Sequence, residues 1–426
     1  MRRTLLGVGL LLMGHLAFGQ TAPVLDPTLF QSAPATDRPV QALGLKASVG
    51  AEGFDQRRPA SGAVHEPQQA IRAVLDFRKA WRLGEQARLT LSDRLEWLQD
   101  DTGHATVRNA LREAYVSVGW DDAWFVDLGR INVRSGVGLG FNPSDWLREG
   151  ASLPQTTQNP ASQRENRLGT VMLKVQTVQG WGAAHLALIP HLAARPDEVS
   201  PYGLDFGRTN ADPELHARLA PRLGERLSLD LLAYARKGRH PQWGLNSTAV
   251  LGDAWIAHLE WSTGGREGLV GPAATRAQSL HHRVAAGLSW TTSNGAVLAI
   301  ERHLATDALS RDDWAIWRLS LEGATARRLG QLRAERSALQ APLVRDAWFM
   351  RVAMNGLLRD PDIDLSGFVR VNPHDRSSLW QLDGSWHASA RVSVHTSVGG
   401  FAGAARSEFG ANPLRSFVAL RAEVAY

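Results

Sequence analysis

The sequence of 426 residues contains no cysteine, which excludes disulfide bonds, thiolate metal sites and a lipid-modified N-terminal cysteine. Beyond its N-terminal region, it also lacks any apolar stretch approaching the ~20 residues that a membrane-spanning helix requires. If such a chain crosses a membrane, it must do so with strands, because lipid offers no hydrogen-bond partners to an unpaired backbone.

Lysine and tyrosine are also scarce. Lysine occurs only at positions 46, 79, 174 and 237, so the formal net charge of +5 comes mainly from arginine. The arginine bias is consistent with a GC-rich genome, and equally with charge ladders on a wall, where the guanidinium fork binds carboxylates. The arginines are scattered at strand spacing and do not cluster on a helix, so we expect no nucleic-acid partner.

The N-terminus has the pattern of a secretory signal. Arg2 and Arg3 precede an apolar core over residues 5–18, and the small residues Ala17 and Gly19 mark a cleavage site. A membrane anchor helix is the alternative, but the segment is too short for one. We predict a signal peptide over residues 1–19, an extended proline-containing periplasmic segment over 20–41, and a folded domain over 42–426.

The final residues show the strand pattern that recurs along the chain. Val418, Leu420, Val424 and Tyr426 share one parity, while the charged Arg421 lies on the other. A period of two predicts a strand with one apolar and one polar face. A soluble sandwich and a membrane barrel both fit this segment. The terminal aromatic residue and the tryptophans near other strand ends favour the barrel, where such rings meet lipid headgroups.

Connections between the predicted strands alternate in length. Tight turns are expected near residues 83–85, 121–122, 178–180, 221–225, 252–253, 292–294, 323–326, 357–361 and 388–390, and long links at 135–166, 191–212 and 263–280. Short periplasmic turns and long outer loops are typical of outer-membrane barrels. We therefore predict an all-β fold: a single transmembrane antiparallel up-and-down β-barrel with an even strand number, 18 within a range of 16–20.

Two stretches resemble a known family. Residues 111–116 read LREAYV and are followed by Leu128-Gly129-Arg130 and by FNPSD at 141–145; SEFG at 407–410 precedes the last strand. Over residues 111–145 and 371–426 the chain resembles the alginate-export-type and related porin-like outer-membrane barrels of Gram-negative bacteria. The resemblance implies passive passage of a solute or polymer through a monomeric barrel.

Polar residues on the inward parity are the candidate lumen residues. A shift of phase near Gly129 predicts a bulge that turns Arg130 inward, into contact with Glu113. A purely structural role for that pair is at least as plausible as a role in transport. The first half of loop 135–166 carries apolar anchors, so we expect it to fold inward as a constriction. The candidates are Arg88, Arg94, Glu96, Glu113, Tyr115, Arg130, Asn132, Arg134, Asp145, Arg148, Arg236, Arg283, Arg370 and Arg421.

Two further patterns carry little weight as catalytic or cofactor sites. Gly136, Gly138 and Gly140 follow a strand, but Pro143 and the absence of a following apolar helix disfavour a nucleotide loop. The histidines at positions 185, 216, 258, 303 and 387 have no evident nucleophile partner in the sequence. We expect no cofactor, no metal and no catalytic residue.

The sequence thus favours an outer-membrane channel, porin or exporter, that passes small anionic or polar solutes or a polysaccharide through an arginine-lined lumen. A barrel-embedded hydrolase and a closed scaffold or receptor barrel remain alternatives. The expected partners are outer-membrane lipid, the barrel-assembly machinery and the solute. Val418, Leu420, Val424 and Tyr426 form the expected membrane and assembly signal.

Overall fold

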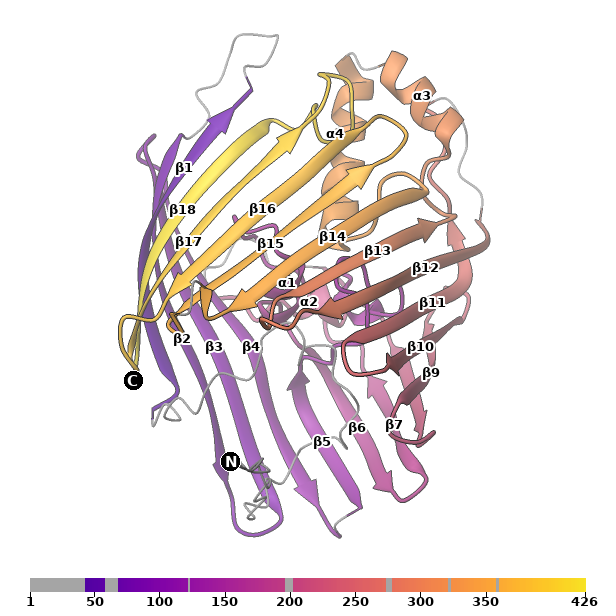
Figure 1. Cartoon of the computed structure of the whole chain (residues 1–426). Coiled ribbons are helices and arrows are strands. Elements are labelled where there is room, and N and C mark those ends of the chain that lie inside the picture. The colour runs from indigo at the N-terminus through magenta and orange to yellow at the C-terminus, as the bar shows by residue number, and fades with distance from the viewer. Residues whose placement is uncertain are drawn as a thin grey trace, which may run out of the picture.

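The computed structural model describes residues 43–57, 68–121, 123–195, 202–272, 278–320, 323–357 and 360–426. The predicted signal peptide and the segment 20–41 lie outside the described residues. Eighteen antiparallel strands follow one another around a closed barrel, because β1 pairs with both β2 and β18 (Figure 1). The predicted all-β barrel and its strand number are confirmed.

The strands have 8 to 15 residues. Both ends of the described chain meet at one end of the barrel, where the amide of Leu43 donates to the carbonyl of Tyr426 at 3.2 Å. The bounds of the strands are β1 Leu45–Gln56, β2 Gln69–Arg82, β3 Ala87–Asp100, β4 Ala105–Gly119, β5 Trp124–Ile131, β6 Thr170–Gln179, β7 Gly182–Ile189, β8 Glu214–Pro221, β9 Leu227–Arg236, β10 Gln242–Leu251, β11 Trp255–Glu267, β12 Gln278–Thr291, β13 Val297–Ala305, β14 Asp346–Asn355, β15 Ile363–Asn372, β16 Ser377–Trp386, β17 Val392–Ala402 and β18 Leu414–Ala425.

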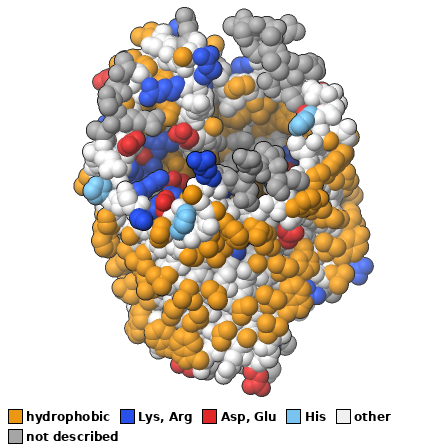
Figure 2. Space-filling view, turned by 180° about the vertical axis from the view of Figure 1, so that it is seen from behind, with side chains coloured by type: hydrophobic (Ala, Val, Ile, Leu, Met, Phe, Trp, Pro, Cys, Tyr) orange, Lys and Arg blue, Asp and Glu red, His pale blue; other side chains and the backbone are white. Residues whose placement is uncertain are grey.

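The two faces of the strands follow the period of two in the sequence. On β18, Val418 and Leu420 are 48% and 53% exposed on the outer surface, while Arg421 and Glu423 line an interior cavity. Hydrophobic side chains cover much of the barrel's outside, and basic and acidic side chains gather in the hollow near its top (Figure 2). Among the described residues, no helix is long and apolar enough to span a bilayer.

Aromatic residues gather where the short turns lie, at the end of the barrel that we call the short-turn end. Trp120 and Trp124 flank one turn with their ring centroids 6.1 Å apart, and Trp255 stacks on Trp290 at 5.7 Å. All four rings are exposed, as is that of Tyr426. Amphipathic rings in this position match the interfacial belt of a membrane barrel.

The longest described connection is 306–345, and it corrects one sequence prediction. The turn expected at 323–326 is instead the start of a helix, α4 (Gly323–Ala338), which follows α3 (Arg311–Leu319). The hydroxyl of Ser310 caps α3 by accepting the amide of Asp313 at 3.1 Å. Both helices cover the end of the barrel opposite the short turns (Figure 1), and Trp314 of α3 is buried in a cluster with Leu329 and Leu332 of α4.

The predicted bulge at Gly129 is also wrong. Although φ at Gly129 is 132°, β4 and β5 stay in register through the pair Tyr115–Gly129. The irregularity lies in β4, where Ser92 of β3 pairs with Glu113 and the next pair skips Arg112. The extra residue brings the side chains of Arg112 and Glu113 to the same inner cavity.

Candidate functional site: the lumen and its inward loop

Loop 132–169 enters the barrel and is bound there by two buried glutamates, Glu260 of β11 and Glu301 of β13, which we call the anchor glutamates. The carboxylate of Glu260 accepts the amides of Val137, Gly138 and Ser144 at 2.8–3.0 Å. Glu301 accepts the amide of Gly140 at 2.8 Å. Both carboxylates are 0% exposed, so the glycine-rich segment binds acidic groups of its own barrel wall.

The glycines of this segment allow the close approach. Gly136 has φ of +100°, and an added Cβ would lie 2.5 Å from an Oε atom of Glu260. At Gly140 an added Cβ would lie 2.5 Å from the ring of Phe349. A side chain at either position would therefore push the loop away from the wall.

The middle of the inward loop is fixed by a buried ion pair. Arg167 donates to Asp145 at 2.7 Å, and both side chains are 1% exposed. Burial alone would raise the pKa of Asp145, but Arg167, Arg164 and Arg148 together hold that pKa below its usual value. Burial lowers the pKa of Arg148 to about 9. The short helix η2 (Trp146–Arg148) places Trp146 in a stack on Tyr234 at 5.5 Å.

The next part of the loop, residues 155–159, crosses to the opposite wall; we call it the strap. At one end, the hydroxyl of Thr156 accepts from Arg72 at 3.2 Å and donates to Glu52 at 2.8 Å. At the other end, the amide of Gln158 donates to Gln381 at 2.7 Å, and Asn159 donates to Asp383 at 3.0 Å. The strap therefore joins β1 and β2 to β16, and it leads into α1 (Pro160–Glu165).

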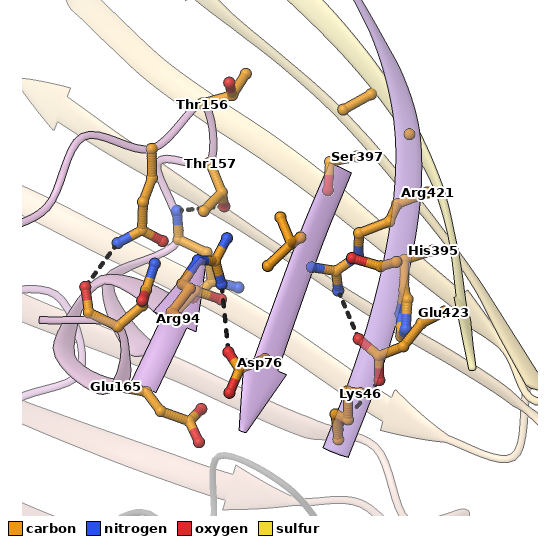
Figure 3. A pocket seen from close by; sticks show the side chains of 18 of the residues that line it. Lys46, Asp76, Arg94, Thr156, Thr157, Glu165, His395, Ser397, Arg421 and Glu423 are labelled. Atoms are coloured by element: carbon orange, nitrogen blue, oxygen red, sulfur yellow. Dashed lines mark hydrogen bonds and ion pairs between the residues drawn. The ribbon is translucent and has the colours of Figure 1, made fainter. Parts of the chain in front are cut away.

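Two cavities lie beside the strap. The larger, of about 640 Å³, is bounded by the inner faces of β1–β4 and β16–β18 and by the inward loop (Figure 3). The smaller, of about 310 Å³, reaches Asp100 and Thr106 at the long-loop end of the barrel. Glu52, Arg72, Glu96, Gln155 and Thr156 line both cavities and so form their junction.

Ion pairs form a continuous ladder on the wall of the larger cavity. Arg72 binds Glu52 at 2.8 Å and Glu96 at 2.6 Å. Arg94 binds Glu96 at 3.2 Å and also binds Asp76. Asp76 in turn binds Arg112. Charges of both signs are equal in number among the lining residues: Lys46, Arg72, Arg78, Arg94, Arg112, Arg134 and Arg421 against Glu52, Asp76, Glu96, Glu113, Glu165, Asp383 and Glu423.

The structure brings some of the predicted lumen residues together and places others elsewhere. Lining the larger cavity are Arg94, Glu96, Glu113, Asn132, Arg134 and Arg421. Arg88 and Tyr115 share the inward parity but do not line this cavity. Asp145 and Arg148 lie inside the inward loop. Three further arginines bind other residues of the protein: Arg236 binds Glu214, Arg283 binds Asp307, and Arg370 donates to the carbonyl of Gly140.

The predicted contact between Arg130 and Glu113 is wrong. Glu113 binds Arg78 at 3.1 Å. Arg130 shares the outward parity of Leu128, and its guanidinium donates to the carbonyls of Leu111 and Leu204 at 2.9 and 2.5 Å. Because β5 keeps its register through Gly129, Arg130 does not turn into the lumen. The segment around α2 (Phe206–Thr209) covers it near the rim.

Sequence reasoning missed the anchor glutamates and four residues of the ladder, Glu52, Arg72, Asp76 and Arg112. A signal was present, since Glu260 and Glu301 each lie two residues from a histidine of the same parity. His258 and His303 bind Glu301 at 2.6 and 2.9 Å. What the sequence could not show is that these strands face the glycine-rich segment across the lumen.

Comparisons with known proteins agree on the fold. The structure is similar to three Pseudomonas aeruginosa proteins, each matched at a TM-score of 0.50–0.51. OccK5 (OpdH) and OccK11 (OpdR) are each 9% identical in sequence over 90% of this chain, covering 96% and 94% of theirs. OccK2 (OpdF), solved in complex with glucuronate, is 14% identical over 89% of this chain and 98% of its own.

No family model and no curated protein matches the sequence. The resemblance to alginate-export-type barrels is therefore not confirmed, whereas the porin-type barrel fold is shown by the structure and its similarity to these proteins.

Proposed function

We propose that this chain is an outer-membrane channel for small polar solutes. The proposal rests on one combination of features: a closed barrel, apolar outside, encloses polar cavities whose charges are balanced. Lipid stabilises the outer surface, and water stabilises the inner one. The glucuronate bound by the structurally similar OccK2 is a solute of the proposed size class. Stepwise conductance of the purified protein in planar bilayers is the expected result, and a silent protein would refute the proposal.

The inward loop narrows this channel where the strap meets the ladder. At the β16 end, the strap donates hydrogen bonds to Gln381 and Asp383, and Thr157 accepts one from Gln381. At the junction of the two cavities, the hydroxyl of Thr156 binds Arg72 and Glu52. A polymer would need this junction to open, which is why the proposal favours small solutes over a polysaccharide.

Thr156→Val tests the narrowing, because valine keeps the shape of threonine and loses both hydrogen bonds. The expected result is a larger or more variable single-channel conductance and faster entry of larger sugars into proteoliposomes. Ser247→Ala, on the outward face of β10, is the control and leaves both unchanged. A Thr156→Val channel identical to the native one would contradict a constriction at this junction.

A mild preference for anions is the proposed selectivity. Arginine supplies most of the basic side chains, but the paired carboxylates of the ladder offset most of their charge. Reversal potentials under a salt gradient measure this property directly. Marked cation selectivity would refute it.

The remaining contacts of the proposed channel are with the membrane and its machinery. Val418, Leu420 and Tyr426 expose their side chains on the barrel's outside at the end of the chain. We propose that this face, with Val424, contacts outer-membrane lipid and carries the signal for barrel assembly. Export through residues 1–19 would bring the chain to that membrane.

A hydrolase is the second candidate function, and one cluster favours it. The Nε2 atom of His387 lies 3.0 Å from Asp364, and its Nδ1 atom lies 2.9 Å from the hydroxyl of Ser393. An oriented histidine beside a hydroxyl is the arrangement of a nucleophilic triad. These side chains line neither of the two cavities, so we rank the channel first. Labelling by a fluorophosphonate that is lost in Ser393→Ala would support the hydrolase, whereas an unlabelled native protein would exclude this mechanism.

A further inference from the structure

Two charged side chains of the larger cavity differ from the rest because neither is neutralised by the protein. Lys46, Arg78 and Arg421 bind carboxylates at 3.1, 3.1 and 3.7 Å, and the other basic lining residues belong to the ladder. Arg134 is the exception. Among the described residues, no hydrogen bond or ion pair reaches its side chain, which is exposed to the cavity.

Glu165 is the corresponding exception on the acidic side. Asp383 accepts hydrogen bonds from Asn159, Gln381 and Ser397. The other acidic lining residues bind basic ones. Within the described parts of the chain, the carboxylate of Glu165 has no hydrogen-bond or ion-pair partner, and its side chain is exposed to the cavity, where Figure 3 labels it.

These two side chains belong to the same loop and to neighbouring segments of it. The side chain of Asn132 donates to the carbonyl of Glu165 at 3.5 Å, and Arg167 donates to Asn132 at 2.7 Å. The part of the loop that holds Asn132 and Arg134 therefore runs beside the last turn of α1, which holds Glu165. Arg134 and Glu165 both line the cavity, yet they do not form an ion pair with each other at 4.0 Å or less.

We propose that Arg134 and Glu165 form a two-point site for dipolar solutes, which carry a carboxylate and an ammonium group on one small molecule. Water screens the two side chains only partly inside the lumen, so each attracts the solute group of opposite sign. A solute with a single charge meets one attractive and one repulsive group, and a neutral solute meets neither interaction. The cavity of about 640 Å³ accommodates such a molecule.

The inference rests on the proposed channel function, and the test separates the two. Interruptions of single-channel current by 4-aminobutyrate are compared with interruptions by erythritol and by gluconate. The native channel is expected to be interrupted more by 4-aminobutyrate, and Arg134→Gln and Glu165→Gln are each expected to weaken that interaction about threefold, the size of one exposed ion pair. The charge-exchanged double variant R134E/E165R restores it. Arg302→Gln, on the barrel's outside, is the control and has no effect.

Each outcome decides one of the claims. Without any conductance, the channel function itself fails. Conductance with equal interruption by all three solutes overturns the dipolar site and leaves the channel standing. An effect of Arg134→Gln without one of Glu165→Gln overturns it too, because the site would then select anions alone. Native melting of each variant in detergent shows that the barrel has folded.

Discussion

The attachment of the inward loop to Glu260 gives the sharpest prediction. In Glu260→Ala, the buried amides of Val137, Gly138 and Ser144 lose the acceptor that now lies 2.8–3.0 Å away. Each unsatisfied buried donor costs about 1–3 kcal/mol. Removing the buried carboxylate relieves part of its own desolvation cost, so we expect a net loss of about 3–5 kcal/mol in loop docking.

A loss of that size shifts the ratio of docked to released loop by roughly two to four orders of magnitude. Hydrogen exchange measured by mass spectrometry should therefore lose protection over residues 137–144, while the strands keep theirs. Single-channel current should become larger or noisier as the loop leaves the lumen. Glu225→Ala, in the exposed turn between β8 and β9, is the control. Unchanged protection and unchanged current in Glu260→Ala would refute the anchoring role of this carboxylate.

Three further predictions concern the same loop and its surroundings. Gly140→Ala should release the glycine-rich segment, because its Cβ would meet the ring of Phe349, while Gly180→Ala, in open space, should not; tryptic cleavage within the loop measures the difference. Asp145→Asn should lower the melting temperature, since it leaves Arg167 charged and buried at a cost of about 3–5 kcal/mol, and an unchanged melting curve would contradict it. Glu408 lies in the loop between β17 and β18. Burial and the nearby Asp375 raise the pKa of Glu408 to about 7, so its protonated carboxyl stabilises this loop. That stabilisation is full below the ordinary carboxyl pKa and is lost as pH rises through 7, so loop protection should fall between pH 5 and 8 in the native chain but not in Glu408→Gln.

The barrel could be predicted from the sequence because the pattern that defines it lies within each strand. A strand in a barrel wall must alternate apolar and polar residues, and Val418, Leu420 and Arg421 show that alternation without any knowledge of their neighbours. The short turns fall in the gaps between such stretches. The turn expected at 323–326 is wrong, because the surrounding arginine-rich segment is a helix whose buried side chains include Leu329 and Leu332. The long link expected at 263–280 is shorter, because β11 extends to Glu267 and β12 begins at Gln278.

The site could be predicted only in part, because it depends on contacts across the lumen. The inward parity identified Arg94, Glu96 and Arg134 as candidates. It could not tell which charges are paired by the opposite segment, nor that Glu260 binds the glycine-rich turn. Arg130 was misplaced for the same reason: a glycine with positive φ permits a bulge, but the register with β4 decides whether one forms.

The absence of cysteine allows the central claim, an aqueous lumen bordered by the inward loop, to be tested directly with a single introduced thiol. Glu165→Cys places it in the larger cavity, and Leu420→Cys places it on the barrel's lipid-facing surface. With a charged, water-soluble methanethiosulfonate applied during single-channel recording, the account predicts a stepwise change of current for Glu165→Cys and none for Leu420→Cys. A current that responds to neither thiol, or only to that at position 420, would contradict it.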